Sequence, residues 1–130
     1  MAVTLSNAAA SAAADAVVDL LDAGSSNANP QLRINISGNA STVATLNFTG
    51  STAFGAASNG VATAGTIADD TNAAGGTAAA FQCVDQDGTV VFDGSVTATG
   101  GGGDITLSSV SIAATDTVSI SSLTYTQPTS

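Results

Sequence analysis

Residues 31–48 read QLRINISGNASTVATLNF, and this stretch decides the expected fold. Apolar side chains occupy every second position in both of its halves: Leu32, Ile34 and Ile36, then Ala44, Leu46 and Phe48. A period of two residues is typical of a strand with one buried face. Because Gly38 to Ser41 separates the halves, we expect a β-hairpin made of residues 31–37 and 42–48.

Similar patterns recur along the rest of the chain. Further strands are expected at residues 60–67, 77–84, 89–97, 105–112 and 117–125. Asp85-Gln86-Asp87-Gly88 is a hairpin-turn signal, and the four glycines from Gly100 to Gly103 indicate a flexible hairpin loop. The alternation slips in phase at Ser108-Ser109 and at Ser121-Ser122, which predicts a bend and a bulge. About seven short antiparallel strands predict a mainly β domain, a β-sandwich or a jelly-roll-like fold.

The segment from Ser6 to Ala23 is the one strong helix signal, because alanine has the highest helix propensity. Ser6 or Asn7 can cap its start and Gly24 can end it. An apolar stripe follows helical spacing: Ala10, Ala14, Val17, Val18 and Leu21. The opposite face carries Asp15, Asp19 and Asp22, either as a solvated outer face or as a contact with a cationic partner. Residues 1–24 are thus expected to form an arm and helix, and residues 25–130 a β-sandwich, within one compact unit.

The composition predicts a folded domain with a thin apolar core. Ala, Thr, Ser and Gly make up more than half of the 130 residues, whereas Leu, Ile, Val and Phe make up only 28. Thin cores are often completed by neighbouring molecules, so we expect a homo-oligomer or a docked partner. The formal charge of −9 disfavours nucleic acids and anionic membranes as partners. The charge either keeps the surface soluble or matches a basic protein surface.

Few side chains suit catalysis at neutral pH. The sequence has no His, no Lys and no Glu, so one chain cannot form a Ser-His-Asp triad, and we expect no enzymatic activity. Cys83 lies in a strand pattern and is expected to be a buried structural residue. Asp85-x-Asp87-Gly88 resembles the start of a calcium loop, to which Asp69-Asp70 could add oxygens. A plain hairpin turn explains the same residues, so we expect no cofactor.

Met1 to Ala23 does not resemble a targeting segment. It lacks positive residues, and Asp15 and Asp19 interrupt the apolar run that a signal peptide or a membrane span requires. We therefore expect synthesis in the cytoplasm, and a location outside the cell only if the protein is released as part of a particle.

Several phrases of the sequence resemble a known family when they are taken in order. They are residues 1–6 (MAVTLS), 16–24 (AVVDLLDAG), 53–64 (AFGAASNGVATA), 87–96 (DGTVVFDGSV) and 118–126 (VSISSLTYT). Together they resemble a family of small proteins from tailed bacteriophages and prophages, encoded among the virion-structure genes. The chain departs from that pattern at Ile36 to Ser41, where a longer, proline-containing loop is expected in relatives.

The resemblance implies a virion component, and a capsid decoration or cement protein fits it best. Such a protein would clamp the major capsid protein or other virion proteins through many modest contacts. The N-terminal helix or arm would dock on one subunit while the β-sandwich bridges another. The candidate contact residues are Leu5, Asp15, Val17, Asp19 and Leu21.

Two other functions stay open at this point. One is a tail or fibre accessory protein of the virion. The other, from a different class, is a module that binds cell-surface glycans through loop tips at Asn59-Gly60 and at Gly100 to Gly103.

Overall fold

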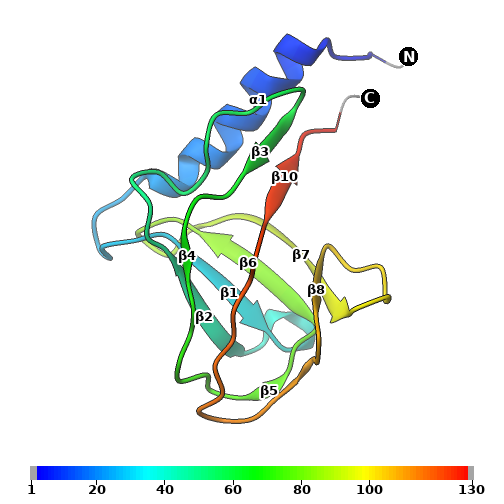
Figure 1. Cartoon of the computed structure of the whole chain (residues 1–130). Coiled ribbons are helices and arrows are strands. Elements are labelled where there is room, and N and C mark those ends of the chain that lie inside the picture. Colours follow the sequence, from blue (N-terminus) through cyan, green and yellow to red (C-terminus); the bar gives the residue numbers. More distant parts are fainter. Residues whose placement is uncertain (1–2, 129–130) are drawn as a thin grey trace.

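The computed structural model describes residues 3–128, and within that range it contains one α-helix, two short 3-10 helices and ten strands (Figure 1). The helical segments are α1 (Asn7–Asp19), η1 (Leu20–Asp22) and η2 (Ser37–Asn39). The longer strands are β1 (Gln31–Asn35), β2 (Thr42–Phe48), β6 (Ala80–Val84) and β7 (Val90–Ala98). The shorter strands are β3 (Val61–Thr63), β4 (Ile67–Ala68), β5 (Gly76–Thr77), β8 (Ile105–Leu107), β9 (Ser111–Ile112) and β10 (Thr124–Thr126). The expectation of a mainly β fold with one N-terminal helix is confirmed.

Helix α1 forms where the alanine repeats predict it. Its first turn is capped by the Ser6 hydroxyl, which accepts a hydrogen bond from the Ala9 amide at 3.1 Å. The helical segment ends at Asp22, and Ala23 is already extended. Gly24 then turns the chain with a φ of 98°, which glycine readily adopts. The buried face of α1 and η1 consists of Ala10, Ala14, Val18 and Leu21. Small alanines on this face let the helix lie close to β3 and β10, beside which it runs in Figure 1.

Six strands form the main sheet, in the order β4-β2-β1-β6-β7-β8. Strand β1 lies in its middle and pairs antiparallel with both β2 and β6. The β1–β2 hairpin turns through η2, where Gly38 has a φ of 72°. The β6–β7 hairpin turns through Asp85 to Gly88, whose amide donates to the Asp85 carbonyl at 3.1 Å. The hairpins predicted at residues 31–48 and at Asp85 to Gly88 are therefore confirmed.

The expectation of a hairpin loop at Gly100 to Gly103 is wrong. Strands β7 and β8 pair in parallel, with Val96 opposite Ile105. Parallel neighbours usually require a crossover of about a dozen residues or more, but here the chain doubles back within the short loop between Ala98 and Ile105. Glycine makes this fold-back possible, since a Cβ atom at Gly103 would lie 2.8 Å from the Thr97 hydroxyl oxygen. The sheet consequently mixes antiparallel pairs with one parallel pair.

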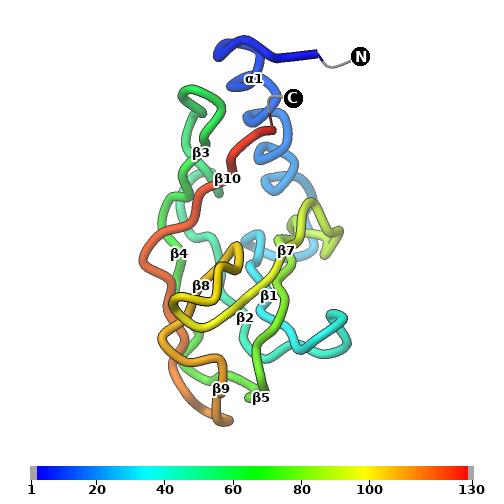
Figure 2. Tube along the Cα trace, turned by 90° about the vertical axis from the view of Figure 1, so that its right-hand side faces the viewer, coloured from blue at the N-terminus to red at the C-terminus, as the bar shows by residue number. Residues whose placement is uncertain are grey.

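The main sheet curls, and the C-terminal part of the chain runs across its open side (Figures 1 and 2). Two small ladders complete the fold, β3 with β10 and β5 with β9. Val18 and Leu21 from the helical segment belong to the same buried cluster as Leu32, Ile34 and Phe48 from the sheet. The helix and the strands therefore share one core.

The expected strand at residues 117–125 forms only in part. Val118 makes an isolated bridge to Asp70, and regular pairing resumes at β10. Likewise, the expected strand at residues 105–112 is divided into β8 and β9. These two interrupted stretches face each other, and the groove between them is the candidate functional site.

Candidate functional site

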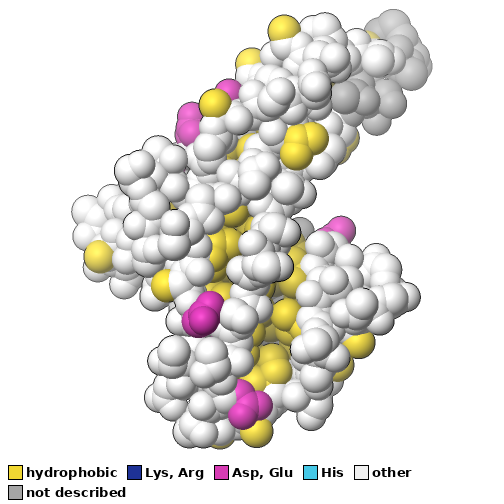
Figure 3. All heavy atoms as spheres, in the orientation of Figure 1, with side chains coloured by type: hydrophobic (Ala, Val, Ile, Leu, Met, Phe, Trp, Pro, Cys, Tyr) yellow, Lys and Arg dark blue, Asp and Glu magenta, His cyan; other side chains and the backbone are white. Residues whose placement is uncertain are grey.

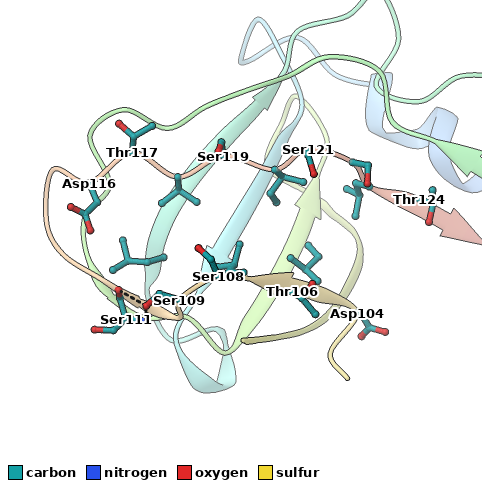
Figure 4. Close-up of a pocket in the computed structure, with 17 residues that line it drawn as sticks. Asp104, Thr106, Ser108, Ser109, Ser111, Asp116, Thr117, Ser119, Ser121 and Thr124 are labelled. Carbon is teal, nitrogen blue, oxygen red and sulfur yellow. Dashed lines mark hydrogen bonds between the residues drawn. The ribbon is translucent and has the colours of Figure 1, made fainter. Parts of the chain in front are cut away.

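A groove of about 560 Å³ separates β8 and β9 from the segment Asp116–Thr124 (Figure 4). Its walls belong to two stretches only, residues 104–112 and 116–124. Serine and threonine hydroxyls line most of the rim: Thr106, Ser108, Ser109, Ser111, Thr117, Ser119, Ser121, Ser122 and Thr124.

The first wall is the outer edge of the main sheet, because β8 is the last strand in the sheet order. The Leu107 carbonyl accepts the Thr99 amide at 2.9 Å, so the backbone groups of Leu107 point back toward β7. Backbone groups of successive strand residues point to opposite sides. Those of Thr106 therefore point out of the sheet, toward the groove.

The second wall is held from its far side. The Val118 amide and carbonyl bond to Asp70 at 2.8 and 3.0 Å, and the Leu123 carbonyl accepts the Ala64 amide at 2.8 Å. Val118 and Leu123 are five positions apart, so an uninterrupted strand would turn them to opposite sides. The chain must slip by one residue between them, and it bends at Ser121. These bonds agree with the phase slip predicted at Ser121-Ser122. An extended backbone at Ser119, which follows Val118 directly, would direct its amide and carbonyl toward the groove.

The apolar floor of the groove is the least covered part of the core. Five of its side chains keep between 5% and 9% of their surface exposed: Ile105, Leu107, Ile112, Val118 and Leu123. Every other apolar core residue is exposed by 4% or less. Figure 3 shows apolar atoms at the bottom of a hollow on this face of the molecule. The core is therefore nearly, but not fully, closed at the groove.

The groove is acidic at both ends. Asp116 and Asp104 stand at opposite ends in Figure 4, and both residues are exposed. Asp104 Oδ2 accepts the Ser95 amide at 3.0 Å, and Asp116 Oδ2 accepts the Ala113 amide at 2.9 Å. The sequence contains a single Lys or Arg, Arg33, which lies in β1 and donates to Gln31 Oε1. The groove therefore presents negative charge, hydroxyls and strand backbone around an apolar floor.

The contact residues suggested by the resemblance lie along the helical segment, away from this groove. Leu21 is fully buried, so the expectation that it contacts a partner is wrong: its side chain is part of the protein's own core. Leu5 and Val17 are partly buried, and Asp19 is exposed. Asp15 Oδ1 accepts the Ala57 amide at 2.7 Å, so this carboxylate already has an internal partner.

A smaller hollow of about 270 Å³ lies beside the helix and is bordered by Asp15, Asp19 and the segment 52–56. A partner contact by Leu5, Asp15, Val17 or Asp19 stays a prediction.

The acidic turn at Asp85 to Gly88 bonds to the backbone. Asp85 Oδ1 accepts the amides of Asp87 and Thr89 at 2.9 and 2.8 Å. Asp87 Oδ1 accepts the amides of Ser25 and Ser26 at 3.1 and 3.0 Å, and these bonds, that from Ser25 above all, lower the pKa of the Asp87 carboxyl. Within residues 3–128, no three potential metal-ligating side chains come together.

Most of the aspartates serve the same structural purpose. Seven of the ten accept hydrogen bonds from backbone amides: Asp15, Asp22, Asp70, Asp85, Asp87, Asp104 and Asp116. A short carboxylate can bond backbone amides in turns and loops, which a longer side chain does less readily. This role accounts for aspartate at seven of the ten acidic positions. Two of the seven, Asp15 and Asp22, lie in the helical segment, and the helical pattern alone did not predict their contacts.

Two other expectations concern Cys83 and the loop tips. Cys83 is buried in β6 as predicted, and burial raises the pKa of its thiol. At the Asn59-Gly60 tip, Gly60 is buried, and its amide donates to the Ser11 hydroxyl of α1 at 3.0 Å. That amide is therefore not available to a glycan.

Comparisons of the chain with protein-family models, with curated proteins and with solved structures give no match. Among the described residues, no helix is long and apolar enough to cross a membrane.

Proposed function

We propose that this protein is a structural component of a phage virion, a capsid decoration or cement protein that stabilises the shell by binding neighbouring proteins. The observation that carries the proposal is the groove, which offers a partly exposed apolar floor and strand edges. Groups of this kind suit contact with another polypeptide. The resemblance to phage proteins is the reason for expecting that the partner belongs to a virion.

The chemistry of the surface supports a binding role over a catalytic one. The groove is lined by hydroxyls and backbone groups, and the chain has no His or Lys that could activate a serine as a nucleophile. The net charge of −9 favours a partner with a basic surface and opposes contact with a phosphate backbone. Modest contacts of this kind stabilise a shell when they are repeated over many copies.

The direct test is reconstitution on particles that lack this protein. Purified protein is added to such particles, and bound copies are located by cryo-electron microscopy. Density spaced regularly over the capsid subunits is expected, together with a higher temperature of DNA release. Density at the tail alone would instead assign the protein to the tail, and an unchanged release temperature at full occupancy would rule out a cement role.

A further inference from the structure

We propose that the groove accepts one extended strand of a partner protein, inserted between β8 and the segment Asp116–Leu123. This strand would bring apolar side chains at alternate positions and a Lys or Arg near each end. The inference deepens the proposed function and rests on it only for the identity of the partner.

The backbone of both walls favours a strand over any other ligand. On the first wall, the pairing of Leu107 with β7 leaves the Thr106 backbone groups on the outer edge of the sheet. On the second wall, alternation from Val118, which bonds to Asp70 on the far side, would place those of Ser119 on the groove side. An inserted strand can pair with two edges at once, since strands pair at a spacing of about 4.8 Å. A helix satisfies its own backbone groups and would leave both edges unpaired.

The size of the groove fits a short segment. A volume of about 560 Å³ is within the range of roughly 300–1,000 Å³ that holds a drug-sized ligand, which is comparable to a few residues of extended peptide. Strand β8 spans about 10 Å along its three residues, at about 3.3 Å per residue. A strand of about five residues would cover β8 and extend one residue past each of its ends.

The floor explains why alternate side chains of the partner should be apolar. Ile105, Leu107, Ile112, Val118 and Leu123 are the most exposed members of the core, and all five line the groove. A strand places every second side chain on one face, and that face would cover this floor. Insertion would therefore complete the core of this protein while it forms the interface, as in other cases of strand addition.

The charges identify the kind of partner and argue against a second copy of this chain. Asp104 and Asp116 are exposed at the two ends of the groove, and each uses its Oδ2 atom for its own backbone contact. A second copy would add another net charge of −9, and its single cation, Arg33, is already bonded within β1. A basic segment of a different protein would neutralise both aspartates and would not add negative charge.

The test uses the full chain and a capped synthetic peptide, Lys-Val-Thr-Val-Thr-Val-Lys. Binding is followed by NMR on the isotope-labelled protein. Saturable shifts of the Thr106, Ser119 and Ser121 amides are expected. A peptide N-methylated at alternate residues, which cannot pair along one edge, should bind at least tenfold more weakly. Shifts outside the groove alone, an absence of shifts, or equal binding of the methylated peptide would overturn the inference.

A matched pair of double variants tests the charges. Asp104→Asn with Asp116→Asn keeps an acceptor oxygen for each backbone amide and removes both charges from the groove. Asp69→Asn with Asp93→Asn removes two charges from exposed residues that do not line the groove. The first pair should weaken peptide binding about fivefold and the second less than twofold. Equal weakening would show that only the overall charge matters. It would overturn the placement of the partner's Lys or Arg residues beside Asp104 and Asp116.

The same variants separate this inference from the proposed function. If the groove pair binds particles as well as the unmodified protein and the peptide test fails, the virion role stands and strand insertion is wrong. If the peptide binds at the groove but the protein does not bind particles, strand insertion stands and the virion role is wrong.

Discussion

The two sides of the curled sheet differ in how completely they close. On the β1–β2–β6 side, Leu32, Ile34 and Leu46 are fully buried, and both edges of β1 are paired. On the groove side, Leu107 and Ile112 each keep 9% of their surface exposed, and β8 has only three residues. Both sides draw on the same few residue types, so composition does not explain the contrast.

Continuity of the strand pairing explains it better. The β1–β2 ladder continues on both sides of a register shift between Ile34 and Asn35. The apolar alternation is broken there as well, because Asn35 is buried beside Ile34 and Val43 beside Ala44. In the C-terminal stretches the alternation slips at Ser108-Ser109 and at Ser121-Ser122. Each slip moves the following apolar residues to the other face and interrupts pairing. The two sides therefore differ in whether strand pairing resumes directly after a break in the alternation, and on the groove side it does not.

The same substitution on both sides should give the largest measurable contrast. Leu46→Ala removes a fully buried side chain from a paired strand, so we expect a loss of about 4 kcal/mol in the free energy of unfolding. Leu107→Ala should cost only about 2 kcal/mol, because its site is already partly open to water. Urea unfolding followed by circular dichroism measures both values. Equal losses would mean that the groove side is as tightly packed as the β1 side.

Gly94 in β7 tests how closely the β8 side packs on the sheet. A Cβ atom there would lie 2.6 Å from the Phe81 ring and 2.7 Å from Asp104 Oδ2. Gly94→Ala should therefore cost about 1–3 kcal/mol of unfolding free energy through overpacking. At Gly55 the nearest atom would be 3.8 Å away, so Gly55→Ala is the matched control and should change stability little. Thermal unfolding of the two variants measures the difference. Similar unfolding midpoints would contradict the close packing of β7 against Phe81 and Asp104.

Asp70 joins the closed side to the groove wall. Its Oδ2 accepts the Thr45 amide of β2 at 2.8 Å, while its backbone pairs with Val118. Asp70→Ala leaves the Thr45 amide without this acceptor, so we expect a loss of about 1–2 kcal/mol and faster hydrogen exchange at Val118. Asp69→Ala is the neighbouring control, at an exposed residue. Unchanged exchange at Val118 would show that the wall is held independently of Asp70.

The smallest expected effect is a dependence on pH at the β6–β7 turn. Because hydrogen bonds from Ser25 and Ser26 lower the pKa of Asp87, its charged form stabilises the fold. That contribution is complete above the ordinary aspartate pKa of about 3.9 and is lost as the pH falls through the lower pKa of the folded state. Asp87→Asn keeps the acceptor oxygen but cannot titrate. The stability difference between the protein and this variant should therefore shrink below about pH 4, and a constant difference would contradict the assignment.

Local patterns predicted the elements that depend on neighbouring residues. The Ser6 cap, the end of the helical segment just before Gly24, the two hairpins and the burial of Cys83 were all accessible from the sequence. Leu21 was misplaced as a contact residue because helical spacing identifies an apolar face but not what covers it. The fold-back at Gly100 to Gly103 was missed because a glycine loop is compatible with either strand direction.

The sequence by itself determined a mainly β protein with one alanine-rich helix, a thin core and almost no reactive side chains. It also contained both phase slips, at Ser108-Ser109 and Ser121-Ser122. Only the tertiary structure decided that the two slipped segments face each other and form one groove with Asp104 and Asp116 at its ends. The reason is physical: alternation is a property of one strand, whereas a groove depends on which strands lie side by side, and that is set by contacts between residues far apart in the chain.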